Sequence, residues 1–146
     1  MAFTNWASFT IRASALTVGT SGQDTAVTLP ETITSFWAVA TKTTEANADN
    51  LFTVRLQAQV DSLWVDLSWT LWQETVPLVD ATDAAGSVTP TPNIHDADTT
   101  APTVMMHAYY AAIPSNVIRS IWVVSGTGPA VTFSVVANYQ IVNFNG

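Results

Sequence analysis

Hydrophobic and polar positions alternate most regularly between residues 52 and 70, in two runs separated by Asp61 and Ser62. Alternation with a period of two residues is typical of a β-strand with one buried and one solvated face. A two-residue turn at Asp61 and Ser62 brings the apolar positions of both runs onto one face of a hairpin. The cross-strand pairs predicted on that face are Val60 with Leu63, Ala58 with Val65, Leu56 with Leu67, and Val54 with Trp69.

The polar face of this hairpin carries a predicted ion pair. Gln57 lies opposite Asp66, and Arg55 is placed diagonally within reach of that carboxylate. Such a cross-strand pair contributes about 0.2–1 kcal/mol. The turn lacks the glycine that tight hairpins favour, so we expect either a left-handed backbone at Asp61 or a loop that opens by one residue. We interpret residues 52–70 as the central antiparallel hairpin of an all-β domain.

Other segments rich in Thr, Val and aromatic residues predict further strands. They are residues 8–15, 24–29, 35–43, 103–110, 117–124 and 131–141. In the first of them, Arg12 is expected on the polar face and Ile11 on the apolar one. The first half of 35–43 is apolar on both faces, which suits a strand that is covered on both sides or whose outer face is an interface. The glycine-rich segment 125–129 is expected to join the last two strands as a second hairpin.

The pattern of many short strands joined by turns, without a long helix-period segment, predicts a two-sheet antiparallel sandwich. Both the jelly-roll and the immunoglobulin-like topology remain open. The single domain is expected to span residues 8–142, preceded by an arm or edge strand at 1–7 and followed by a poorly ordered tail at 143–146. Prolines and aspartates accumulate in residues 74–102. We expect a long acidic, Pro-rich loop there, either extended or flexible, with one short strand near 87–89.

Composition narrows the classes of function. Hydrophobic residues make up 48% of the chain and charged residues 10%, which is too apolar for disorder, and no run reaches the roughly 18 apolar residues of a membrane helix. The first residues show no secretory signal, and the chain has no cysteine for disulfides or thiol chemistry. A net charge of −7 with four basic residues argues against nucleic-acid and membrane partners. The apolar content, with six tryptophans, predicts apolar surface for a partner.

Candidate catalytic and metal-binding residues are few. His107 alternates with Met105 and Tyr109 and is interpreted as a packed or interface side chain. The segment His95-Asp96-Ala97-Asp98 has residue types that bind cations, but it lacks the glycine-punctuated spacing of a calcium loop, so a solvated acidic loop is favoured. No serine lies in a Gly-X-Ser-X-Gly nucleophile motif. We therefore expect no enzyme activity, no cofactor and no metal site.

Three tryptophans are expected on outward faces. Trp64 lies on the polar face of the central hairpin, Trp37 on the second face of its strand, and Trp122 next to Ile121. Outward indoles can stack on sugar rings or anchor a protein interface. They can also be covered by the long loop or by the second sheet. Core, protein-interface and sugar-binding roles all remain open for them.

Two stretches resemble small capsid decoration, or cement, proteins of tailed bacteriophages. In that family a strand ending in Leu-Gln-X-Ser-X-Asp leads through a short turn to Trp-X-Asp-Leu. The corresponding residues here are Leu56, Gln57, Asp61, Trp64, Asp66 and Leu67. Gln59 stands where the family pattern has serine. The stretch IRSIWVVSGTGPAVTFSVVANYQ is similar to the Arg-bearing strand, Gly/Pro turn and Phe/Val strand that close the family's domain.

The resemblance implies a structural virion protein, commonly a homotrimer, that is made in the host cytoplasm and binds the outer surface of the capsid. Its partners would be the major capsid protein and copies of itself, and many modest contacts would add up through multivalency. The residues expected at these interfaces, besides residues 74–102, are Phe3, Trp6, Trp37, Trp64, Trp122, Asp96 and Asp98. The alternative is a carbohydrate- or receptor-binding sandwich of a phage tail spike or an adhesin.

Overall fold

The computed structural model shows an all-β chain. It describes residues 2–30, 32–45, 50–78, 94–98 and 104–144. The strands in these ranges are β1 (Ala2–Val18), β2 (Ser21–Gln23), β3 (Val27–Thr28), β4 (Phe36–Glu45), β5 (Leu51–Val60), β6 (Leu63–Leu78), β7 (Ile94–Asp98), β8 (Val104–Tyr110), β9 (Val117–Ser125) and β10 (Ala130–Phe144). Among the residues described there is no helix with the length and apolar character needed to cross a membrane. The predicted all-β class is confirmed.

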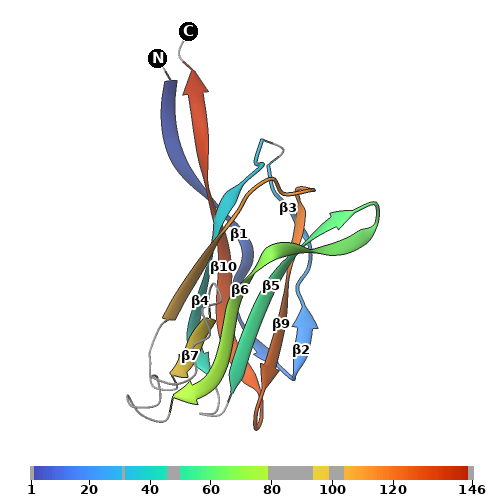
Figure 1. The fold of residues 1–146 in the computed structure, drawn as a ribbon, viewed down its shortest axis with the longest axis vertical. Helices are drawn as coiled ribbons and strands as arrows, with labels where there is room; N and C mark the ends of the chain where they lie inside the picture. The colour runs from blue at the N-terminus through green and yellow to red at the C-terminus, as the bar shows by residue number, and fades with distance from the viewer. Residues whose placement is uncertain (1, 31, 46–49, 79–93, 99–103, 145–146) are drawn as a thin grey trace.

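The strands form two sheets that pack as a sandwich (Figure 1). One sheet has the order β1-β10-β4-β8, and the other has the order β2-β9-β5-β6-β7, with β3 also paired to β9. The pairing is nested along the chain, since β1 pairs with β10, β2 and β3 with β9, β4 with β8, and β5 with β6. Nested antiparallel pairs divided between two sheets make a jelly roll. The structure thus selects one of the two topologies left open by the sequence.

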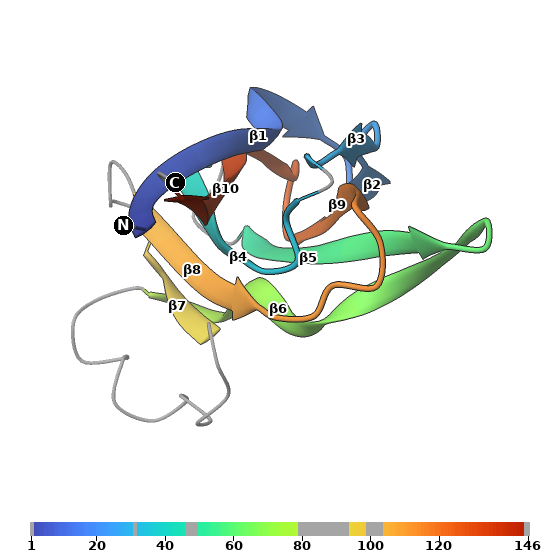
Figure 2. The same ribbon diagram turned by 90° about the horizontal axis from the view of Figure 1, so that it is seen from above.

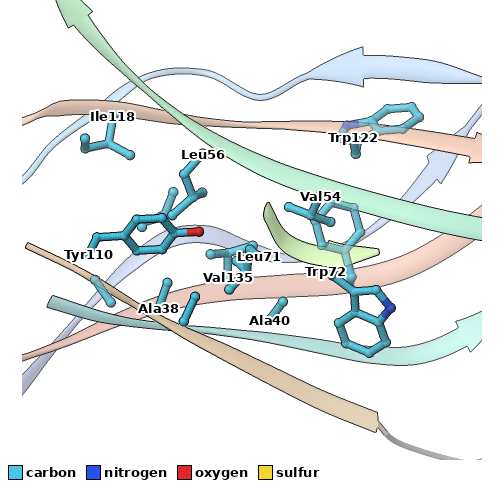
Figure 3. Packing of buried hydrophobic residues seen from close by; sticks show 14 of the residues in the cluster. Ala38, Ala40, Val54, Leu56, Leu71, Trp72, Tyr110, Ile118, Trp122 and Val135 are labelled. Atoms are coloured by element: carbon cyan, nitrogen blue, oxygen red, sulfur yellow. The ribbon is translucent and has the colours of Figure 1, made fainter. Parts of the chain in front are cut away.

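The core lies between the sheets and is formed by one face of each. Figure 3 shows side chains from both layers meeting there, and the following are 0% exposed: Val54, Leu56, Ile118, Ala38, Ala40 and Val135. The small alanines of β4 leave room for larger rings nearby. The ring centroid of Phe52 lies 4.7 Å from that of Phe133 and 5.7 Å from that of Trp72. Each large side chain buried in this way contributes about 1.5–3 kcal/mol.

The tip of the central hairpin forms as predicted. Val60 pairs with Leu63, and Asp61 and Ser62 have φ values of 49° and 69°. Both turn residues are therefore left-handed, as a type I′ turn requires. The predicted ion pair is also confirmed, because Arg55 Nη1 lies 2.8 Å from Asp66 Oδ2.

The predicted register is wrong nearer the body of the sandwich. The pairing shifts on both sides of Arg55, so that Arg55 lies opposite Thr70 and Val54 opposite Trp72. The predicted pairs of Leu56 with Leu67 and of Val54 with Trp69 do not form. Extra residues on one strand are β-bulges, which increase strand twist. Beyond them the hairpin extends away from the sandwich (Figures 1 and 2), and Leu63 is 69% exposed although it continues the apolar face.

The predicted hairpin of the last two strands does not exist. β9 pairs with β5 in one sheet, whereas β10 pairs with β1 and β4 in the other. Residues 125–129 therefore cross between the two layers. Each strand turns one face inward, and these inward faces meet across the core, where β9 buries Ile118 and β10 buries Phe133. Alternation predicted each strand correctly but could not distinguish side-by-side from face-to-face packing.

The two termini form a two-stranded ribbon that projects from the sandwich (Figure 1). β10 pairs with β4 only up to Asn138, while its pairing with β1 continues from Ala7 and Tyr139 to Ala2 and Phe144. Residues 2–7 are thus the first part of an edge strand, and they are not separated from residue 8. The predicted tail is likewise shorter, because residues 143 and 144 belong to β10.

The predicted loop at residues 74–102 is partly strand. β6 continues to Leu78, and β7 (Ile94–Asp98) pairs with it in parallel. His95, Asp96 and Asp98 therefore lie on the backbone of an edge strand and not in a loop. The short strand predicted near residues 87–89 falls outside the described residues. The strand predicted at 24–29 is reduced to β3, with β2 preceding it.

A buried ion pair connects the two sheets. Register shifts in β1 flank Arg12 and turn it inward, contrary to the prediction that it faces solvent. Its Nη1 donates to Asp24 Oδ1, and the other oxygen of Asp24 accepts from the hydroxyl of Ser120 in β9. The Arg12 guanidinium also lies 4.0 Å from the ring centroid of Phe133. A charge held in this position needs its partner, because low dielectric makes an unpaired charge costly.

Candidate functional site

The structure brings two of the predicted interface residues together at the base of the terminal ribbon. Trp6 of β1 pairs with Gln140 of β10, and Asn138 pairs with Trp37 of β4 two residues earlier. Trp37 in turn pairs with Tyr109 of β8. Directly paired residues point to the same face of a sheet. The register therefore places these side chains in neighbouring rows on the outer face of one sheet.

A cleft of about 410 Å³ opens among these side chains. Its wall consists of Trp6, Trp37, Tyr109 and residues 138–140, and residues 32–36 close it on the other side. Residues 32–35 precede β4, and this segment diverges from β10 at the point where the ribbon leaves the sandwich (Figure 1). Every lining residue that the structure describes is uncharged. The cleft is therefore a neutral, aromatic site with amide and hydroxyl groups around it.

The aromatic side chains of the cleft are only partly covered. Trp6 is 59% exposed, Tyr109 44% and Trp37 38%. The ring centroid of Trp37 lies 5.0 Å from that of Tyr109 and 5.6 Å from that of His107. Ring contacts at these distances are favourable and fix the orientation of the indole. His107 thus lies beside Trp37 on an exposed face, where its ring contacts the indole, and the prediction of a packed or interface side chain stays open between its two alternatives.

One tyrosine behind the cleft is buried and does not face it. Tyr110 points into the core, where its ring centroid lies 5.4 Å from that of Phe36. Burial raises the pKa of the Tyr110 hydroxyl, because desolvation disfavours the phenolate. The hydroxyl therefore stays protonated at neutral pH. The cleft itself offers aromatic faces and neutral hydrogen-bonding groups, which suits binding.

Trp64 faces outward as predicted but is covered by a charged neighbour. The guanidinium of Arg119 lies 4.0 Å from the Trp64 ring centroid. Arg119 Nε donates to Gln57 Oε1 at 2.9 Å, and Gln57 Nε2 donates to Asp66 Oδ1 at 2.8 Å. The outer face of this hairpin is thus a closed network of satisfied polar groups. A ligand would have to displace Arg119 before it could stack on that face of Trp64.

The prediction that Trp122 faces outward is wrong. Its side chain is 8% exposed and belongs to the core, because it lies on the same face of β9 as Ile118 and Val124. Trp122 pairs with Gly22 of β2, and a Cβ at Gly22 would come within 2.3 Å of the indole. The strand is apolar on both faces, so alternation alone could not assign its inner face. Trp122 is therefore excluded as a binding platform.

The remaining predicted interface residues are placed only by their backbones. Phe3 pairs with Asn143 in the ribbon, and Asp98 pairs with Leu78 in β7, the strand that also holds Asp96. Their side chains lie outside the described part of the structure. Among the side chains that are described, no three His, Asp or Glu residues converge on a possible metal position.

Sequence reasoning missed most of the cleft. Tyr109, Asn138 and Gln140 come from two strands that are distant from Trp37 and Trp6 in sequence. Only the pairing of β1, β10, β4 and β8 makes them neighbours. The available signal was that Trp37 and Tyr109 each alternate with core residues along their own strand. That signal gives the face of each residue but not its neighbours on the next strand.

Comparison of the chain with models of protein families, with curated proteins and with solved structures finds no match in any of the three.

Proposed function

We propose that this protein is a non-enzymatic structural component of a virion, namely a capsid decoration protein that binds the major capsid protein lattice and stabilises the head. The sequence resemblance gives the class. The observation that carries the proposal is the ribbon formed by both termini, which projects from the sandwich with apolar side chains on both faces. A jelly roll alone carries no functional argument, because the fold serves many unrelated roles.

The ribbon exposes apolar side chains on both faces, which suits contact with another molecule. Trp6 pairs with Gln140 and Asn5 with Ile141, so Trp6 and Ile141 lie on opposite faces, and both side chains are exposed. A two-stranded ribbon without further cover is marginally stable in water. A neighbouring subunit or a capsid protein that packs on either face would supply the missing contacts.

Further exposed apolar residues are distributed over the molecule. Leu63 and Val65 lie at the tip of the central hairpin, and Leu16 and Val18 lie near the end of β1 opposite the ribbon. Separate patches of this kind suit a protein that touches several neighbours at once. Each contact can then be modest, because linked contacts raise the total affinity. We extend the proposal to self-association as a homotrimer on the outer capsid surface.

The test is binding to undecorated, expanded heads of the phage that encodes the protein. Co-sedimentation should show saturable binding, and light scattering should show an oligomer of the free protein. The variant Ile141→Asn should weaken binding by about tenfold or more if a buried apolar contact worth about 1.5 kcal/mol is lost. The matched control is Val123→Asn, because Val123 is similarly exposed but lies on the body of the sandwich.

The control should bind heads like the unchanged protein. A stable monomer that does not sediment with heads would contradict the proposed function. Equal loss of binding in both variants would contradict the role given to the ribbon.

A further inference from the structure

We propose that the cleft at the base of the terminal ribbon binds a neutral saccharide, with Trp6, Trp37 and Tyr109 as the stacking surface and the amides of Asn138 and Gln140 as hydrogen-bonding groups. This activity goes beyond the proposed structural role and does not depend on it. The head-binding variant is at Ile141, on the face of the ribbon opposite Trp6, whereas the saccharide site lies on the Trp6 face, where the ribbon meets β4 and β8.

The exposed rings provide the apolar part of the site. A pyranose presents a face of C–H groups that packs against an aromatic ring, and tryptophan offers the largest such ring. Trp6 and Tyr109 line the cleft and keep about half of their surface exposed. Single exposed apolar residues are common on protein surfaces, whereas a contiguous exposed apolar patch marks a binding site. Two open rings that line one cleft therefore point to a flat, partly apolar ligand.

The middle ring of the site is already held in place. The Trp37 ring contacts the rings of Tyr109 and His107, which lie two residues apart in β8. Trp37, Tyr109 and Asn138 also lie where the backbone pairing is regular, between Phe133 and Asn138 of β10 and β4 and along the whole of β8. A site whose side chains are fixed before binding loses less conformational entropy when the ligand arrives. The arrangement is thus preorganised for a small ligand.

The polar groups fit sugar hydroxyls better than charged ligands. Asn138 and Gln140 each offer an amide donor and a carbonyl acceptor, and the hydroxyls of Thr32, Thr34 and Ser35 can do both. A sugar hydroxyl also donates and accepts, so such groups match it. No Lys or Arg is among the described lining residues, and a phosphate, sulfate or carboxylate would normally require one.

The size and shape of the cleft agree with this class of ligand. Its volume of about 410 Å³ lies within the range of roughly 300–1,000 Å³ that is usual for small-molecule sites. A protein partner would instead be expected to meet a broader apolar patch with a polar rim. We therefore assign the cleft to a mono- or disaccharide unit, either free or at an accessible position of a longer glycan.

The experiment uses the whole chain and a panel of neutral oligosaccharides built from glucose, galactose, mannose or N-acetylglucosamine. Binding is measured on an array and by tryptophan fluorescence, with soluble oligomers titrated to about 10 mM, well above a Kd of ~1 mM. A sialylated set and purified bacterial surface polysaccharide are separate arms. We expect a neutral set to bind and to change the fluorescence, while the sialylated set does not bind. If only the polysaccharide binds, the ligand is a polymer. If the free oligomers bind as well, a free sugar is sufficient.

Four variants locate the site. Trp6→Ala and Tyr109→Ala should each weaken saccharide binding by about tenfold, which corresponds to one lost stacking contact. Gln140→Ala should also weaken binding and serves as the second test if an aromatic variant folds poorly, as judged by its unfolding midpoint. The matched control is Trp64→Ala, because this outward indole lies on the other sheet beneath Arg119. It should bind like the unchanged protein.

Three results of the saccharide experiment would overturn the assignment, and a fourth comes from self-association and head binding. They are no binding of any neutral oligosaccharide or of the polysaccharide, equal loss in the Trp64→Ala control, and binding confined to the sialylated set. If Tyr109→Ala weakens self-association or head binding and leaves saccharide binding intact, the cleft is a protein interface and the assignment is also wrong. Failure of head binding with retained saccharide binding would refute only the proposed structural role.

Discussion

Apolar residues are buried in the body of the sandwich and exposed in its two projections, which are the terminal ribbon and the tip of the β5–β6 hairpin. The same strands run through both regions. In the body, Leu56 of β5 and Phe133 of β10 are fully buried, because the opposite sheet covers them. In the projections, Leu63 and Trp6 are mostly exposed, although the strands pair regularly on either side of them, from Ala2 to Thr10 in β1 and from Gln57 to Leu63 in the hairpin. The strand pairing is similar in both regions, and only the cover differs.

This difference predicts which residues determine the stability of the fold and which determine association with other molecules. Residues in the body bury surface within the chain and should determine the free energy of unfolding. Residues in the projections can bury comparable surface only against another molecule. Substitutions in the first group should therefore change the unfolding transition, and substitutions in the second should change binding while leaving that transition nearly unchanged.

The largest contrast is expected between two tryptophans. Trp122→Ala should lower the free energy of unfolding by about 3–5 kcal/mol, because it empties a large volume in the core. Trp6→Ala should change it by less than ~0.5 kcal/mol, since an exposed side chain loses little contact. Urea unfolding followed by far-UV circular dichroism measures both. Similar losses for the two variants would show that the ribbon packs on the body.

The two ion pairs give a second contrast. The side chains of Arg12 and Asp24 are 9% and 17% exposed, whereas those of Arg55 and Asp66 are 44% and 46% exposed. Asp24→Ala should destabilise the fold by about 2–3 kcal/mol because it leaves the Arg12 charge without its partner between the sheets. Asp66→Ala should cost less than ~1 kcal/mol. Denaturant unfolding at two salt concentrations provides the measurement.

Only the exposed pair should weaken markedly as salt rises, because screening acts mainly on solvated charges. A loss at Asp24 no larger than the loss at Asp66 would mean that Arg12 finds another partner or reaches water.

A smaller effect is expected at Gly22, which packs closely against Trp122. Gly22→Ala places a Cβ 2.3 Å from Cζ2 of Trp122, and the indole or β2 must move. Overpacking of this kind costs about 1–3 kcal/mol. The neighbouring substitution Ser21→Ala is the control, because Ser21 is exposed in the same strand. Thermal unfolding and the near-UV tryptophan signal should change for Gly22→Ala and not for the control.

The sequence predicted what depends on neighbours along the chain. The turn at Asp61 and Ser62 and the ion pair of Arg55 with Asp66 follow from alternation within two adjacent strands. Such features involve residues close in sequence, so local patterning is sufficient to predict them. Most of the longer strands and the sandwich class were predicted for the same reason, whereas β7 was predicted as loop.

The sequence could not predict what depends on contacts between distant strands. β9 and β10 have the alternation of a hairpin, yet they lie in different sheets because their apolar faces meet across the core. Arg12 faces inward because irregular pairing of β1 turns it towards Asp24. The cleft combines side chains from β1, β4, β8 and β10, and nothing in any single segment indicates that they meet. Alternation also continues into the two projections, so it does not show at which residue the opposite sheet stops covering the strand.

The smallest effect on stability is expected at the hairpin tip. Leu63→Ser should change the free energy of unfolding by less than ~0.5 kcal/mol, because the side chain is already mostly in water. If the tip packs against a neighbouring molecule in the assembly, the same leucine can contribute about 1.5–3 kcal/mol there, and the substitution should weaken that contact by about tenfold or more. Urea unfolding and sedimentation velocity over a range of concentrations measure the two quantities on one sample. A loss of stability above ~1 kcal/mol, with association unchanged, would place the tip on the body of its own chain and remove the distinction between body and projection at this end of the molecule.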